Sequence, residues 1–198
     1  MFNNTPVKKS DYVSKKLPYD LIEGPIDAYE ELMSTLYDPE ERDKLEWAIG
    51  AIISGDTKTI QKFMVLYGGS GTGKSTILNI ISDMFDGYVC DRLDAKSLAR
   101  SSDNFATEQL STNPLILIQH DGDLSHIEDN TKLNSIVSHE PIKINAKFKN
   151  EWTLKPQSFI FMGTNKPVQI TDAKSGLLRR LIDVHPSGRL VPEKDMIN

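Results

Sequence analysis

The amino-acid sequence predicts an α/β fold. We expect a three-layer core with a central, mostly parallel sheet, a β-hairpin insertion and a small N-terminal helical subdomain. Two observations lead to this prediction. Short apolar runs with strand character, at 63–67, 115–118 and 158–162, alternate with stretches in which apolar residues recur at helical spacing. A glycine-rich turn at 68–76 joins the first run to the helical stretch that follows it.

The chain of 198 residues divides into three parts by composition. Residues 1–24 are polar, with two lysine pairs and two prolines, which predicts a flexible lead-in. Between 25 and 58 the apolar residues follow helical spacing, and Asp38-Pro39 interrupts them. We therefore expect two helices joined near residue 38, forming a small packing subdomain. Residues 59–198 should form the core.

The elements of the core follow in order along the chain. After the strand at 63–67, a helix should run from the glycine-rich turn to residue 85. The remaining expectations are a short strand at 88–90, a helix-compatible stretch at 95–110, a strand at 115–118, a helix at 130–137, hairpin arms at 142–148 and 152–155, a strand at 158–162, a short helix at 177–180 and a strand at 181–184.

The turn fits the phosphate-loop pattern Gly68-x-x-x-x-Gly73-Lys74-Ser75 between a strand and a helix. Glycines let backbone N–H groups turn towards a polyphosphate, and the helix start adds the positive end of its dipole. Lys74 is expected to reach the β- and γ-phosphates, and the Ser75 hydroxyl to take one Mg²⁺ position. The sequence thus predicts a site for ATP and Mg²⁺. The residues expected to hold the nucleotide are Gly68, Gly69, Ser70, Gly71, Thr72, Gly73, Lys74, Ser75 and Thr76.

Two further groups of polar residues follow apolar strands. Asp121 and Asp123 come after 115–118, where one carboxylate could hold Mg²⁺ and another could polarise the attacking water. The alternative is an ordinary acidic turn. Asn165 follows 158–162, where an uncharged amide could position water at the γ-phosphate. The same residues are also compatible with a simple turn.

Charge is unevenly distributed along the chain. The net charge is −5, yet the window 143–180 contains eight basic and two acidic residues. Lys143, Lys147 and Lys149 fall on the predicted hairpin together with Phe148, a combination that single-strand binding uses. Alternatively, the lysines only solvate an edge strand and the aromatic residues are core anchors. We expect Trp152 to be in the core and the tip lysines to be functional.

Composition also bears on the environment of the protein. The single Cys90 excludes an intramolecular disulfide and indicates a reducing compartment such as the cytoplasm. The longest nearly apolar stretch, at 47–53, is too short to span a bilayer, so no membrane partner is expected.

Together these motifs resemble superfamily 3 helicases, in particular the helicase half of phage and poxvirus-type primase-helicases. The segment 68–76 resembles the Walker A motif of that family and 115–123 its Walker B motif. Residues 137–150 are similar to its third motif with the DNA-contacting hairpin, 159–167 to its motif C and 176–181 to its arginine-finger segment. The motifs occur in the family's order and cover about 45–184.

The resemblance implies an AAA+-like core, a hexamer or other ring with ATP sites between subunits, and single-stranded DNA in the central pore. By position, Asp121 and Asp123 correspond to the Walker B acids and Asn165 to the sensor. Arg180 is the first choice and Arg179 the second for the arginine that reaches a neighbour's γ-phosphate. The host cytoplasm and a primase as partner are further implications. One departure from the family is Gly122, which separates the two aspartates.

Two hypotheses therefore stand. The first is an ATP-dependent motor that moves along single-stranded DNA during phage- or viral-type replication. The second is a nucleotide-dependent oligomeric DNA-binding or loading module with little unwinding activity. A small phosphotransferase ranks last, because it leaves the basic hairpin and Arg179-Arg180 without a role.

Overall fold

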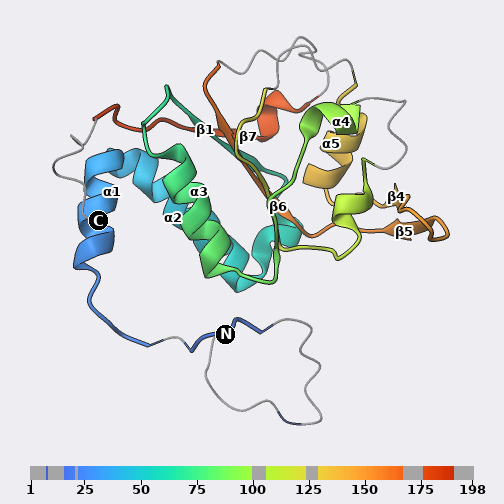
Figure 1. Cartoon of the computed structure of the whole chain (residues 1–198), viewed down its shortest axis with the longest axis horizontal. Coiled ribbons are helices and arrows are strands. Elements are labelled where there is room, and N and C mark those ends of the chain that lie inside the picture. Colours follow the sequence, from blue (N-terminus) through green and yellow to red (C-terminus); the bar gives the residue numbers. More distant parts are fainter. Residues whose placement is uncertain are drawn as a thin grey trace.

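A five-stranded parallel sheet forms the centre of the protein. The computed structural model describes residues 8, 16–20, 22–99, 106–123, 129–166 and 176–189. The strands are β1 (Phe63–Tyr67), β2 (Val89–Cys90), β3 (Ile116–Gln119), β6 (Phe159–Thr164) and β7 (Leu181–Val184), arranged in the order β2-β3-β6-β1-β7. All four pairings are parallel. The predicted α/β fold with a mostly parallel sheet is confirmed (Figure 1).

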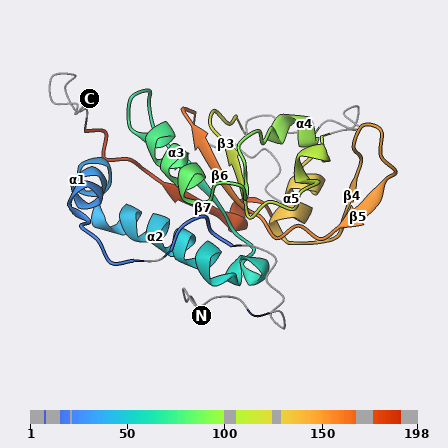
Figure 2. The same ribbon diagram turned by 60° about the horizontal axis from the view of Figure 1, so that its bottom comes forward.

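Helices cover both faces of this sheet (Figures 1 and 2). One face carries α1 (Asp27–Leu36), α2 (Pro39–Ser54) and α3 (Lys74–Met84), and the other carries α4 (Ala95–Ala99) and α5 (Thr131–Val137). Short 3-10 turns lie at η1 (Asp56–Thr59), η2 (Glu108–Leu110) and η3 (Leu178–Arg180). The sheet is thus buried between two helical layers, which explains why its strands read as continuous apolar runs.

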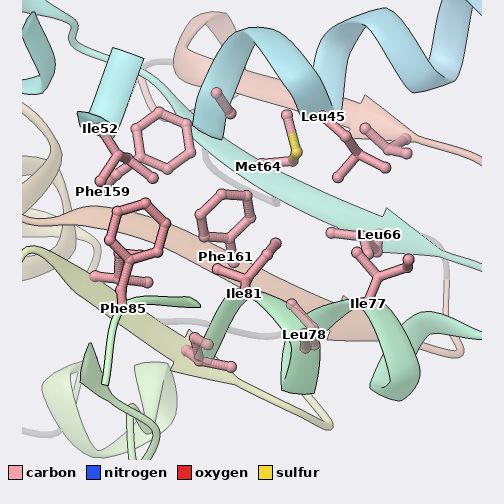
Figure 3. Packing of buried hydrophobic residues seen from close by; sticks show 14 of the residues in the cluster. Leu45, Ile52, Met64, Leu66, Ile77, Leu78, Ile81, Phe85, Phe159 and Phe161 are labelled. Atoms are coloured by element: carbon pink, nitrogen blue, oxygen red, sulfur yellow. The ribbon is translucent and has the colours of Figure 1, made fainter. Parts of the chain in front are cut away.

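Alternating side chains of the strands divide the core into two clusters. Met64 and Leu66 of β1 pack with α1, α2 and α3, together with Phe159 and Phe161 of β6 (Figure 3). Phe63 and Val65 point to the opposite cluster, where they meet α4 and α5. This alternation is the period of a strand in which both faces are buried.

The two N-terminal helices form where the sequence predicts them. Pro39 occupies the first turn of α2, where its missing N–H costs nothing, and Gly55 ends the helix in the left-handed conformation. The α1 and α2 helices contribute Met33, Leu36 and Leu45 to the same cluster as the sheet. Residues 25–58 therefore supply part of one layer of the core.

The predicted hairpin is present but its paired arms are shorter than expected. The β4 (Ile142–Ile144) and β5 (Trp152–Leu154) strands pair antiparallel, and the segment 145–151 leaves the ladder as a turn. The cause is local: the Lys149 N–H donates to the Ala146 carbonyl at 3.2 Å, and Phe148 has φ +63°. Trp152 is half-buried against the core, which agrees with the expectation of a core residue.

Other expectations need smaller corrections. The helix-compatible stretch 95–110 is not one helix, because α4 ends at residue 99 and η2 begins at 108. Most of the intervening residues lie outside the described part of the chain. Within the described residues, none of the helices has the length and apolar character needed to cross a bilayer.

Candidate nucleotide site

The glycine-rich turn between β1 and α3 has the backbone that the phosphate-loop pattern requires. Gly71 and Gly73 both have positive φ, at +77° and +83°, a region that other residues adopt at a cost. A Cβ atom on Gly73 would also lie 2.7 Å from Leu36 Cδ2, which belongs to the last turn of α1. Glycine at this position thus serves both the conformation of the loop and its contact with the N-terminal helix.

Lys74 is the first residue of α3, and its side chain folds back over the loop. It is 7% exposed, and its Nζ donates to the Gly68 carbonyl at 2.7 Å and to the Gly69 carbonyl at 2.6 Å. Burial lowers the pKa of Lys74, while the charge of Asp121 acts in the opposite direction. A buried ammonium group is therefore held at the glycine-rich loop, next to the start of a helix.

The two aspartates after β3 have different surroundings. Asp121 is exposed and acts electrostatically on Lys74. The Asp123 carboxylate instead accepts hydrogen bonds from Lys96 Nζ at 2.9 Å and Lys166 Nζ at 3.4 Å. Of the two candidate acids, Asp121 is therefore the one whose charge acts on the loop lysine, and Asp123 is held in an ion-pair cluster.

Glycine between these aspartates has a steric reason. The Gly122 N–H donates to the Gly163 carbonyl at 2.6 Å, so the loop after β3 lies directly on β6. A Cβ atom on Gly122 would overlap Cγ and Sδ of the buried Met162, and one on Gly163 would lie 2.7 Å from the His120 carbonyl oxygen. The close approach of two chain segments therefore favours glycine at both positions.

Asn165 directly follows β6, in a bend of the chain. The Lys166 N–H donates to Thr164 Oγ1 at 3.1 Å, and the Gly68 N–H donates to the Thr164 carbonyl at 3.1 Å. The second bond joins the end of β6 to the first residue of the glycine-rich loop. The structure therefore places the exposed Asn165 one residue beyond a direct contact with that loop.

The two arginines at the start of β7 also differ. Arg180 Nη1 donates to Asn134 Oδ1 at 3.1 Å and to the Gly176 carbonyl at 3.2 Å. The Arg179 side chain is exposed, while its backbone carbonyl accepts a hydrogen bond from Lys62 Nζ at 2.7 Å. Arg180 is thus held within its own chain, whereas Arg179 is presented at the surface.

The hairpin presents its basic residues in two settings. Lys143, on β4, forms an exposed ion pair with Glu151 at 2.9 Å, and the hydrogen bond from this pair raises the pKa of Lys143. Lys147, Phe148 and Lys149 lie at the tip, where all three are exposed. The Phe148 side chain is fully exposed, and its backbone has the left-handed conformation. This conformation costs free energy for a residue other than glycine, so the aromatic ring is exposed at a cost to stability.

Several contacts between distant parts of the chain, at the site and away from it, escape the sequence analysis. Lys96 and Lys166 lie 70 residues apart in the chain and meet only because both reach Asp123. His139 is another case: it is 4% exposed, and its ring nitrogens lie 2.9 Å from the Ile60 carbonyl oxygen and 3.1 Å from that of Pro156. No spacing rule connects these residues, so only the fold brings them together.

A model of a family of unknown function, DUF5906, matches residues 66–180. The chain belongs to this family. The matched DUF5906 segment begins within β1 and ends at Arg180, so it contains the glycine-rich loop, both aspartates, the hairpin and both arginines. A search of curated proteins finds no match.

Solved structures show the same fold as this DUF5906 member. An apo structure of the C-terminal region of NrS-1 matches with a TM-score of 0.64 and 18% identity, covering 100% of this chain and 44% of that one. Its A form apo structure matches with a TM-score of 0.62 and 17% identity, covering 90% and 41%. This chain spans less than half the length of these two structures. At these identities the likeness concerns the fold alone.

Proposed function

We propose that this protein is the ATPase core of a nucleic-acid motor of the superfamily 3 helicase type. The observation that carries the proposal is the buried Lys74 at a glycine-rich loop, with Asp121 acting on it from the loop that follows β3. The likeness in fold to the NrS-1 C-terminal region supports an assignment to this architecture. The AAA+-like classification, the ring, which we expect to be a hexamer, and the role in phage- or viral-type DNA replication are parts of this proposal.

The residues of the loop suit a triphosphate. Backbone N–H groups of 68–76 and the Lys74 ammonium would bind phosphate oxygens. Lys74 now donates to two loop carbonyls, and these bonds can be exchanged for phosphate oxygens with little movement of the helix. Ser75 and Asp121 offer the hydroxyl and carboxylate that would hold Mg²⁺, which would supply charge neutralisation. Asn165 would position water.

The exposed arginine suits a role between subunits. A residue that reaches a neighbour's nucleotide must be accessible at the surface of its own subunit, and Arg179 is exposed. Arg180 is instead engaged by Asn134 and Gly176, so we assign the finger to Arg179. In the same assembly, Lys147 and Lys149 would bind the backbone of single-stranded DNA, and Phe148 would stack on a base.

DNA-dependent ATP hydrolysis tests this proposal. We expect ATPase activity that increases with single-stranded DNA and is lost in Lys74→Ala, because the phosphate-binding ammonium is removed. Lys147→Ala should keep the basal rate and lose stimulation by DNA. A wild-type protein that hydrolyses no ATP in its assembled form, with or without DNA, would refute the motor.

A DNA-binding or loading module with little unwinding activity is the second candidate. The ion pairs of Asp123 with Lys96 and Lys166 favour this candidate, because they engage one of the two acids expected to serve catalysis. Asp121 is then the acid that acts on the loop lysine. A site with one engaged acid is suited to binding nucleotide and hydrolysing it slowly. Strand displacement separates the two candidates, because a loader would bind DNA in the presence of ATP without displacing a strand.

A further inference from the structure

Helix α5 lies between the sheet and the β4–β5 hairpin in both views (Figures 1 and 2). Its buried side chains, Leu133, Ile136 and Val137, belong to the cluster that also contains Ile142 and Ile144 of β4. The helix and the base of the hairpin therefore share one packed core. Because packed cores do not deform continuously, a displacement of α5 should move the base of the hairpin.

The connection from α5 to the hairpin is fixed by His139. This residue follows the helix in a left-handed conformation with φ +57°, and its N–H donates to the Ile136 carbonyl at 3.1 Å. One ring nitrogen meets the Pro156 carbonyl, where the chain leaves the hairpin, and the other meets the Ile60 carbonyl, just before β1. Both feet of the hairpin and the strand that leads to the glycine-rich loop thus meet at one buried imidazole.

The opposite link runs from α5 to the arginine turn 176–180. Asn134, in the middle of the helix, accepts a hydrogen bond from Arg180 Nη1 at 3.1 Å. The Arg180 Nε atom is buried and has no hydrogen-bond partner within the described residues, while Nη1 of the same guanidinium donates to Asn134 and Gly176. A side chain of α5 therefore holds the residue that directly follows Arg179.

We propose that Asn134 is a positioning residue that couples the arginine turn to the hairpin through α5. The proposal rests on the proposed function, because it assigns Arg179 to a neighbour's nucleotide and the hairpin tip to DNA. A pull on Arg179 moves Arg180, Arg180 moves Asn134, and α5 carries the displacement to the base of β4. Coupling of this kind is reciprocal, so nucleotide changes DNA affinity by the same factor as DNA changes nucleotide affinity.

The test compares the affinity for a fluorescent oligothymidylate with and without a non-hydrolysable ATP analogue. Coupling free energies of the usual size correspond to a roughly 5–150-fold ratio of the two affinities in the wild-type protein. In Asn134→Ala this ratio should fall to within about twofold of one. The nucleotide affinity without DNA should stay near its wild-type value. A residue with only a structural role would weaken all of these quantities together.

Two variants control the experiment. Asn134→Asp keeps the oxygen acceptor for Arg180 and should keep the coupling ratio. Ser135→Ala removes the neighbouring side chain, which binds Glu140 rather than the arginine turn, and should also keep it. If Asn134→Ala does not fold, Asn134→Ser gives the same test, because its side chain is too short to reach Arg180.

The outcomes separate the inference from the function on which it rests. A wild-type ratio retained in Asn134→Ala overturns the role of Asn134 and leaves the motor intact. If the affinity ratio is lost in Ser135→Ala as well as in Asn134→Ala, the specific role of Asn134 is also overturned. Any substitution in α5 would then be enough to abolish the coupling. A wild-type protein that neither binds nor hydrolyses ATP overturns the proposed function, and the inference with it.

Discussion

Gly163→Ala tests the close approach on which the geometry of the site depends. The new Cβ would lie 2.7 Å from the His120 carbonyl oxygen, whereas carbon–oxygen contacts are normally about 3.3 Å or longer. The loop after β3 must therefore move away from β6 by roughly 0.6 Å. Overpacking of this kind costs about 1–3 kcal/mol, and the bond from the Gly122 N–H contributes about 1 kcal/mol that would be weakened.

The gain from a stiffer unfolded chain offsets part of this cost, by about 0.4–1 kcal/mol. We therefore expect Gly163→Ala to lower the free energy of unfolding in urea by about 2 kcal/mol. The ATPase rate should fall as well, because the displaced loop carries Asp121.

Gly50→Ala is the matched control, because it makes the same chemical change in α2, where no atom beyond the adjacent backbone of the helix lies within 4 Å of the added Cβ. Since alanine favours a helix, this variant should gain up to about 1 kcal/mol. The reasoning is refuted if the two variants change stability in the same direction or if Gly163→Ala is as stable as the wild type.

Three further predictions concern charge and strain. Phe148→Gly relieves a left-handed backbone and should raise the free energy of unfolding by about 1 kcal/mol. The same variant should lower the affinity for single-stranded DNA about tenfold or more, because the stacking ring is removed. A variant that loses both stability and DNA affinity would contradict this. Asp121→Asn should lower the ATPase rate about 100-fold or more, and Asp123→Asn less than about tenfold; the reverse order would contradict the assignment. Hydrogen bonds from Arg42 lower the pKa of Glu30 in the folded protein. The stability that this carboxylate contributes is therefore complete above the pKa of Glu30 in the unfolded chain. It is lost as the pH falls through the lower pKa of the folded protein. The difference in unfolding free energy between wild type and Arg42→Met should accordingly be largest at neutral pH and shrink in acid; a difference that grows in acid would count against this.

Much of the fold is predictable because its signals are local. The strand β7 begins and ends at the predicted residues, and the break between α1 and α2 lies at Asp38-Pro39 as expected. Proline and glycine produce such boundaries through their own backbone preferences. The order of strands in the sheet is not predictable from local signals. Strand β6 lies between β1 and β3, and its position depends on contacts between residues far apart in sequence.

The candidate site shows the same division. The pattern of residues 68–75 predicts a glycine-rich turn between a strand and a helix. The structure has this turn between β1 and α3, with Gly71 and Gly73 in the left-handed conformation. The different surroundings of Asp121 and Asp123 are not predictable, because they depend on lysines from α4 and from the turn after β6. In the same way, Asn134 gives no signal of its own in the sequence, yet it accepts a hydrogen bond from Arg180.

Leu36 of α1 occupies the space over Gly73 that a side chain would otherwise fill. The same last turn of α1 binds the segment after β7, because the Ser187 N–H donates to the Leu36 carbonyl at 2.7 Å and Ser187 Oγ to the Thr35 carbonyl at 2.8 Å. Any widening of the glycine-rich loop would therefore push on α1 and on residues 185–189 together. Helix α1 and residues 185–189 would then move together when a ligand enters the glycine-rich loop.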